Sequence, residues 1–114
     1  MKQNKIYSLL GLAARGRNVV SGEFSTENSI KDGSAVLVIV AEDASDNTKK
    51  RFRDKCSFYK VPIYTYGTKE ELGHSIGKEE RSSAALINEG LARTIMKHLE
   101  ELQNQEVDKK HGEN

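Results

Sequence analysis

The order of hydrophobic and polar residues predicts a chain in which helices alternate with short strands. Near the start, apolar residues recur at helical spacing, as Ile6, Leu9, Leu10 and Ala13. This spacing marks one face of an amphipathic helix over residues 5–14, which ends near Gly16. Residues 35–41 form instead an unbroken apolar run, which indicates a strand buried on both faces of a sheet. The two patterns together favour a mixed α/β protein.

Turn and capping residues delimit the remaining elements. Ser45 and Asn88 are suited to cap helices, and Thr68 with Glu71 has the spacing of a capping box. The further helices predicted are 23–31, 45–59, 68–73 and one after Asn88, and the further strands are 19–20, 63–66 and 83–87. The side chains expected to be buried on these helices are Phe24, Ile30, Phe52, Cys56, Tyr59, Leu91, Ile95, Leu99 and Leu102. Strands alternating with helices give an α/β sandwich whose sheet is covered on both faces.

The length and charge of the chain limit its class. The 114 residues suffice for one domain with a modest core, which we place at residues 1–102, followed by a polar, frayed tail over residues 103–114. Residues 1–60 contain 11 Lys/Arg against 7 Asp/Glu, and residues 61–114 contain 7 against 10. The basic first half fits a polyanionic partner. No apolar run is long enough to span a bilayer, so we expect a cytoplasmic protein without a membrane partner.

Residues suited to catalysis or metal binding are few. Cys56 is the only cysteine, which excludes an intrachain disulfide and paired-cysteine zinc sites, and we interpret it as a packed thiol. Glu42 and Asp43 follow the main predicted strand, where either catalysis or capping of the next helix accounts for them. Three histidines lack the spacing of metal ligands: His74, His98 and His111. We therefore predict no catalytic residue, metal site, cofactor or small-molecule substrate.

The segment between the first two predicted helices has the chemistry of a phosphate site. Arg15 and Arg17 supply planar guanidinium groups that pair with phosphate oxygens. Gly22 allows a close approach to the backbone, and Ser21 precedes the N–H groups at the start of a helix, which attract anions. Asn18 can donate and accept toward a base edge. From these residues alone, an RNA or nucleotide site and an ordinary polar loop both remain open.

Three stretches together resemble the kink-turn-binding ribosomal protein superfamily, which includes the large-subunit proteins seven-Ae and thirty-e. They are Arg15–Asn18, Gly33–Ser45 and Val61–Glu79. The similarity covers roughly residues 5–100 and points to the bacterial YlxQ-like branch. It implies a three-layer α-β-α sandwich with a small mixed four-stranded sheet, and a non-enzymatic protein that binds structured RNA.

The resemblance also implies an RNA surface made of three segments. The first is the entrance to the second helix, matched to Gly16–Asn18 and continuing to Gly22. The second is the acidic end of the main strand, and the third is the loop after the Leu-Gly helix, 78–82. In this surface arginines hold phosphates, while Asn18 and Glu42 contact base edges. The predicted RNA-binding residues are Arg15, Gly16, Arg17, Asn18, Val19, Ser21, Gly22, Lys31, Glu42, Asp43, Lys78, Glu79, Arg81 and Ser82.

The chain departs from the family pattern in two of these segments. Val19 stands where the family often carries Glu or Gln, and Gly22 stands where a lysine often follows. The third segment is usually apolar but is charged here, from Lys78 to Arg81. A valine side chain cannot accept from a guanine edge, so we expect binding of structured RNA in general. Ribosomal RNA and a kink-turn-like internal loop are the candidates.

Two alternatives belong to other functional classes. One is a substrate-recognition subunit of an RNA-modifying enzyme, and the other is a protein-interaction adaptor that uses the final helix. The basic helix segment 49–53 is expected to be solvated, and Tyr64 and Tyr66 are expected to pack under a helix and not against bases. The sequence makes no prediction of the oligomeric state.

Overall fold

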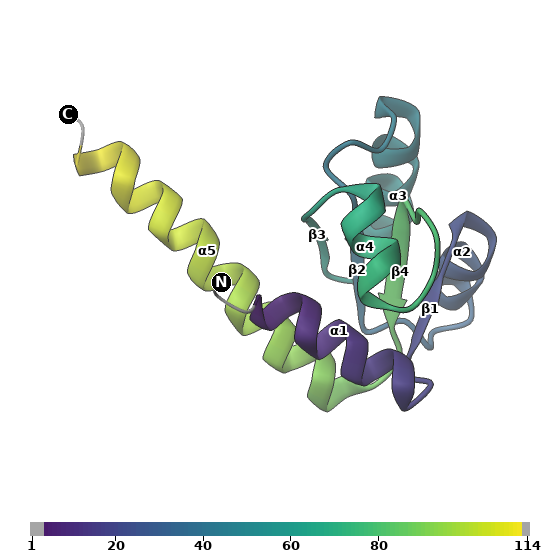
Figure 1. Cartoon of the computed structure of the whole chain (residues 1–114). Helices are drawn as coiled ribbons and strands as arrows, with labels where there is room; N and C mark the ends of the chain where they lie inside the picture. Colours follow the sequence, from purple (N-terminus) through teal and green to yellow (C-terminus); the bar gives the residue numbers. More distant parts are fainter. Residues whose placement is uncertain (1–3, 113–114) are drawn as a thin grey trace.

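The protein is a small mixed sheet covered by helices on both faces (Figure 1). The computed structural model describes the backbone of residues 4–112 and the side chains of residues 4–104. In that part of the chain the strands are β1 (Val19–Ser21), β2 (Leu37–Val40), β3 (Ile63–Thr65) and β4 (Ser83–Leu86), in the spatial order β1-β4-β2-β3. β2 and β3 are parallel, and β4 is antiparallel to both β1 and β2. The predicted α/β class and mixed four-stranded sheet are confirmed.

Helices begin where the sequence supplies capping groups. Over the described backbone they are α1 (Lys5–Arg15), α2 (Glu23–Lys31), α3 (Asp46–Tyr59), α4 (Lys69–Ser75) and α5 (Glu89–Gly112). The Ser45 hydroxyl accepts the N–H of Thr48 at 3.1 Å, and the Asn88 side chain accepts the N–H of Leu91 at 2.9 Å. Thr68 and Glu71 form the reciprocal capping box. These three predicted caps are confirmed, and they satisfy free N–H groups at the starts of α3, α4 and α5.

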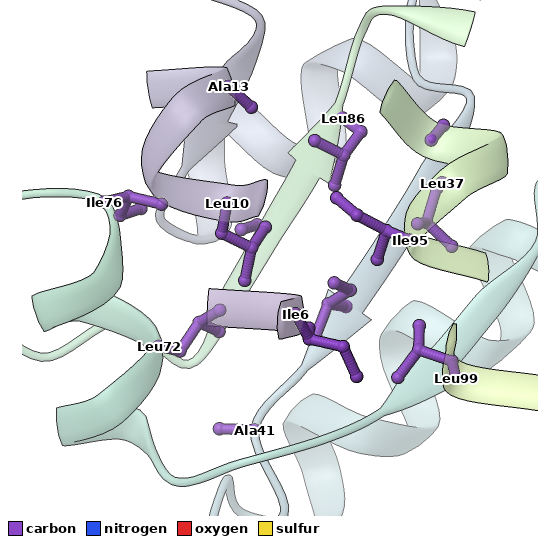
Figure 2. Close-up of a cluster of buried hydrophobic side chains, with 13 residues drawn as sticks. Ile6, Leu10, Ala13, Leu37, Ala41, Leu72, Ile76, Leu86, Ile95 and Leu99 are labelled. Carbon is purple, nitrogen blue, oxygen red and sulfur yellow. The ribbon is translucent and has the colours of Figure 1, made fainter. Parts of the chain in front are cut away.

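The sheet separates two hydrophobic clusters, and β2 contributes to both. Leu37 and Ile39 point toward α1, α4 and α5, whereas Val38 and Val40 point toward α2 and α3. Figure 2 shows the first cluster, in which Leu10 and Ile95 approach the sheet from α1 and α5. Because side chains alternate along a strand, a strand buried on both faces must be apolar at every position. This confirms the three-layer arrangement.

Three side chains expected in the core are exposed. Phe24 is 77% exposed, Tyr59 41% and Leu102 40%. Phe24 and Ile30 are six residues apart, and at 3.6 residues per turn they lie on different faces of a helix. The face of α2 that is buried consists of Thr26, Ser29 and Ile30.

Two helices end later than the sequence predicts. α4 continues to Ser75, past Leu72-Gly73. α5 is helical through Gly112, whereas fraying is expected from Gln103 onward, and Figure 1 shows this segment extending past the sheet. Its Glu, Gln and Lys residues are good helix formers, which favours the continuation of the helix. The domain boundary at residue 102 stays a prediction, and the side chains of residues 105–114, His111 among them, lie outside the described part.

The core predicts unequal effects for two leucines of α1. Leu10 is fully buried, so Leu10→Ala should lower the free energy of unfolding by about 3 kcal/mol. Leu12 is 48% exposed, and Leu12→Ala should change that free energy by less than about 0.5 kcal/mol. Urea denaturation followed by circular dichroism measures both variants. Equal losses would contradict the burial described for α1.

Candidate nucleic-acid interface

One edge of the sheet brings together segments that are far apart in the sequence. β1, β2 and β3 end at this edge and β4 begins there, because β4 runs opposite to its two neighbours. The Ala41 N–H donates to the Ser82 carbonyl at 2.9 Å, and the Gly22 N–H donates to the Ser83 carbonyl at 3.1 Å. We call the predicted residues that meet here the strand-edge cluster: Ser21, Gly22, Glu42, Asp43, Arg81 and Ser82.

Arg81 is held at the end of β1 by two hydrogen bonds. Its Nε donates to the Ser21 hydroxyl at 3.1 Å, and its Nη1 donates to the Glu80 carbonyl at 2.9 Å. The remaining guanidinium donors form no further hydrogen bond with the residues whose side chains are described. A fixed guanidinium with available donors is well suited to bind a phosphate.

The N-terminus of α2 adjoins this arginine. Gly22 precedes the helix at φ +90°, and no side chain caps the N–H groups of the first turn. The acid of that turn, Glu23, accepts from the Thr48 hydroxyl at 3.0 Å and pairs with Arg51 at 3.2 Å. Its negative charge is therefore directed toward α3. Uncapped amides and a partly neutralised carboxylate leave the helix terminus attractive to anions.

The two acidic residues after β2 have different environments. Glu42 is exposed, and its N–H donates to the Gly67 carbonyl at 2.7 Å. The Asp43 carboxylate accepts the N–H of Lys69 at 2.8 Å, at the start of α4. Of the two alternatives, capping of the following helix, α3, is wrong, because Ser45 caps α3 and Asp43 caps α4.

The loop of residues 77–82 is fixed against α4. A methyl group on Gly73 would overlap the carbonyl of Glu79, so only glycine allows the loop to cross the helix this closely. The Lys78 N–H donates to the Gly73 carbonyl at 2.9 Å, and the Arg81 N–H donates to the Lys69 carbonyl at 3.0 Å. Figure 1 shows the loop running from the end of α4 to the start of β4. The backbone is thus ordered while Lys78, Glu79 and Glu80 remain exposed.

The segment Arg15–Asn18 does not form the entrance to the second helix, and that expectation is wrong. It ends α1, and β1 separates it from Gly22. The Arg17 N–H donates to the Ala14 carbonyl at 3.1 Å, and the Asn18 N–H donates to the Ala13 carbonyl at 2.7 Å. This pair of bonds is a Schellman motif with Arg17 in the left-handed position, at φ 59°. Glycine is the usual residue there, but Gly16 stands one position earlier.

The structure places the remaining predicted residues in three surroundings. Arg15 lines an open hollow of about 380 Å³ together with His74 and Gly77, so it lies beside the start of loop 77–82. Val19 packs partly against the core, and Lys31 lies at the far end of α2, 3.9 Å from Glu27. The predicted set therefore divides into the strand-edge cluster and the end of α1, which loop 77–82 connects, with Lys31 outside both.

One protein-family model matches most of the chain. The model described as "Ribosomal protein L7Ae/L30e/S12e/Gadd45 family" matches residues 4–97. The chain belongs to the L7Ae/L30e family. That assignment agrees with the resemblance found in the sequence.

Relatives within the L7Ae/L30e family span nearly the same length. The chain is 45% identical to the RNA-binding protein YlxQ of Bacillus subtilis, over 82% of this chain and 94% of that protein. It is 32% identical to large ribosomal subunit protein eL30 of Methanothermobacter thermautotrophicus, over 69% and 82% of the two chains. A solved protein of unknown function from Bacillus halodurans C superposes with a TM-score of 0.80 at 38% identity, over 82% and 95% of the chains. A 15.5 kD RNA-binding protein of Giardia lamblia shares the fold, with a TM-score of 0.72 at 19% identity over 91% and 92%.

Two residues of the candidate interface were missed by the sequence reasoning. Phe24 lies in the first turn of α2, next to Gly22, and is largely exposed. Its six-residue separation from Ile30 is the signal that could have placed it on the surface. Gly73 positions the loop through a close approach between distant segments, which no local pattern reveals.

Three groups with shifted pKa values serve structure. The Tyr7 hydroxyl donates to Glu71 at 2.9 Å, and burial, followed by this bond, raises the pKa of Tyr7. The same bond lowers the pKa of Glu71 and ties the α4 cap to α1. Burial raises the pKa of the Cys56 thiol to about 11, which fits a packed and unreactive cysteine.

Among the described residues there is no cluster of metal-ligating side chains, and none of the helices there is long and apolar enough to cross a membrane.

The contact at Gly73 predicts a large effect for a single methyl group. Gly73→Ala should lower the free energy of unfolding by about 3 kcal/mol and displace loop 77–82, because the added carbon overlaps the backbone of Glu79. Gly90→Ala is the matched control: its methyl meets only the Asn88 side chain, at 3.5 Å, and alanine favours the helix. Thermal denaturation and amide exchange of residues 77–82 measure both effects. Unchanged exchange in Gly73→Ala would refute the assigned contact.

Proposed function

We propose that the strand-edge cluster and the end of α1, which loop 77–82 connects, bind structured RNA. Membership of the L7Ae/L30e family supports this, as do relatives named as RNA-binding proteins. The observation that carries the proposal is the position of Arg81, held by Ser21 beside the uncapped start of α2. Two groups that bind anions are thereby fixed next to each other on one exposed edge.

The chemistry of the edge assigns a role to each group. Arg81 and the first amides of α2 hold backbone phosphates, and Arg15 and Arg17 extend this contact along loop 77–82. Glu42 and Asn18 face base edges, where a carboxylate accepts from amino groups and an amide both donates and accepts. Because basic groups alternate with acidic ones, the site favours an irregular RNA whose phosphates and base edges match this order. The role is one of binding without catalysis, in the cytoplasm, with ribosomal RNA or a sharply bent internal loop as the ligand.

Removing the charge of Arg81 should weaken binding and its salt dependence together. With an RNA hairpin that contains a bent internal loop, Arg81→Gln should lower affinity about tenfold, and the slope of log affinity against log salt should become shallower by about 0.7 to 0.9. Fluorescence anisotropy at several salt concentrations measures both quantities. Lys97→Gln, a loss of one exposed charge on α5 away from the edge, is the matched control and should change neither.

Two results would overturn the proposal. One is equal weakening by Arg81→Gln and Lys97→Gln, which would mean unspecific attraction by net charge. The other is equal affinity of the wild-type protein for the bent hairpin and for a fully paired duplex of the same length. A difference between these two RNAs is required if the edge recognises an irregular shape.

Replacing Arg17 by glycine should stabilise the protein and weaken RNA binding. Because Arg17 occupies a left-handed conformation, Arg17→Gly should raise the free energy of unfolding by about 1 kcal/mol. The same substitution should lower the affinity for the bent hairpin several-fold, since it removes a charged phosphate contact. Thermal denaturation and anisotropy on one preparation measure both. A more stable variant with unchanged affinity would exclude Arg17 from the interface.

A further inference from the structure

The C-terminal end of α3 exposes an aromatic pair. Phe58 is 77% exposed and Tyr59 41%, and their ring centroids are 4.9 Å apart with the planes at 75°. On the same helix Phe52 and Cys56 are buried against the sheet. Burying a large apolar side chain lowers the free energy. A phenylalanine exposed to this degree on a helix therefore indicates a surface that could be covered by a ligand or a partner.

Cationic groups surround the pair. Phe58 and Tyr59 line an open hollow of about 370 Å³ with Arg51, Asp54 and Lys55. Residues 46–60 carry six Lys/Arg and two Asp. Lys60, directly after the pair, is held at φ 60°, in the left-handed region that lysine rarely adopts. Aromatic faces set among cations bind an unpaired nucleic-acid strand through stacking and phosphate contacts.

This surface is joined to the strand-edge cluster by α2. Arg51 pairs with Glu23 at 3.2 Å and Lys55 pairs with Glu27 at 3.2 Å. The two pairs are one turn apart on each helix, so α2 and α3 lie side by side and run in the same direction. Phe58 is seven residues beyond Arg51, or roughly 10 Å along the helix axis. A strand leaving the start of α2 thus reaches the aromatic pair over a short distance.

We propose that Phe58 and Tyr59 stack on bases of an unpaired strand that flanks the folded RNA held at the strand edge. The inference rests on the proposed function, because that edge determines where the strand begins. Lys60 and Lys55 contact the phosphates of the same strand, and Phe24 is a further exposed aromatic side chain at the start of α2. The ligand is therefore an RNA with a folded part and a single-stranded extension, and not a compact hairpin alone.

The test compares three RNA probes. They are the bent hairpin with blunt ends, the same hairpin with a single-stranded extension of about 10 nucleotides, and that extension as an isolated oligonucleotide. The wild-type protein should bind the extended hairpin roughly tenfold more tightly than the blunt one. Phe58→Ala should remove this gain and leave binding of the blunt hairpin unchanged, whereas Phe58→Trp should retain the gain. Leu12→Ala, which shortens another exposed apolar side chain, should retain it as well.

The Lys60→Gly variant tests the charge of Lys60 without destabilising the fold. Glycine accepts the left-handed conformation, so this variant should be at least as stable as the wild type and should still lose several-fold of the gain from the extension. Photocrosslinking from 4-thiouridine in the extension should label Phe58 or Tyr59.

The outcomes are distinct. The inference is overturned if the wild-type protein binds the blunt and extended hairpins equally, or if Phe58→Ala retains the tighter binding of the extended hairpin. In both cases the proposed function stands. These results are expected if the hollow binds a protein instead of RNA. If neither hairpin binds, the proposed function is overturned. The isolated oligonucleotide then decides, since binding that Phe58→Ala abolishes supports the stacking site and absence of binding refutes it.

Discussion

The candidate interface depends on a contact that leaves no room for a side chain. At Gly73 the backbone of α4 touches the carbonyl of Glu79, and this contact seats loop 77–82 across the helix. The loop in turn brings Arg81 to the Ser21 hydroxyl, and so joins the end of β1 to the start of β4. The hydrogen bonds from Lys78 to Gly73 and from Arg81 to Lys69 depend on the same close approach of the loop to α4. A packing constraint inside the fold therefore sets the position of the surface arginine.

Two cations occupy backbone conformations that favour glycine. Arg17 follows the end of α1 and Lys60 follows the end of α3, both at positive φ. Each costs the folded state of order 1 kcal/mol or more relative to glycine. Such strain is retained where it serves something besides folding, and here both side chains are charged, exposed and placed on proposed RNA contacts. The same feature therefore occurs on both layers of the sandwich, after α1 on one face and after α3 on the other.

Local sequence patterns predicted most helices and strands. The positions of the site residues depend on contacts between segments that are far apart in the sequence. The unbroken apolar run gave β2, and capping residues gave the starts of α3, α4 and α5, because these signals act within a few residues. The position of Arg15–Asn18 was wrong because the resemblance matched it to the helix entrance, although the strand predicted at 19–20, which is β1, separates it from Gly22. The capping role of Asp43 at α4 could not be predicted because its partner Lys69 is 26 residues away. Strand order and loop crossings fix such pairs, and neither is written in the spacing of one segment.

The positive and negative charges of the strand-edge cluster indicate what kind of ligand fits it. A surface for any nucleic acid would be uniformly basic, since phosphates dominate unspecific affinity. Here Glu42 is exposed beside Arg81, and the acid of α2, Glu23, is directed to Arg51 on the neighbouring helix. An exposed carboxylate repels a regular duplex backbone but accepts hydrogen bonds from bases that an irregular RNA turns outward. In the proposed RNA site, this alternation would lower affinity for paired RNA and retain it for a folded one, so that selectivity would arise from repulsion as much as from contact.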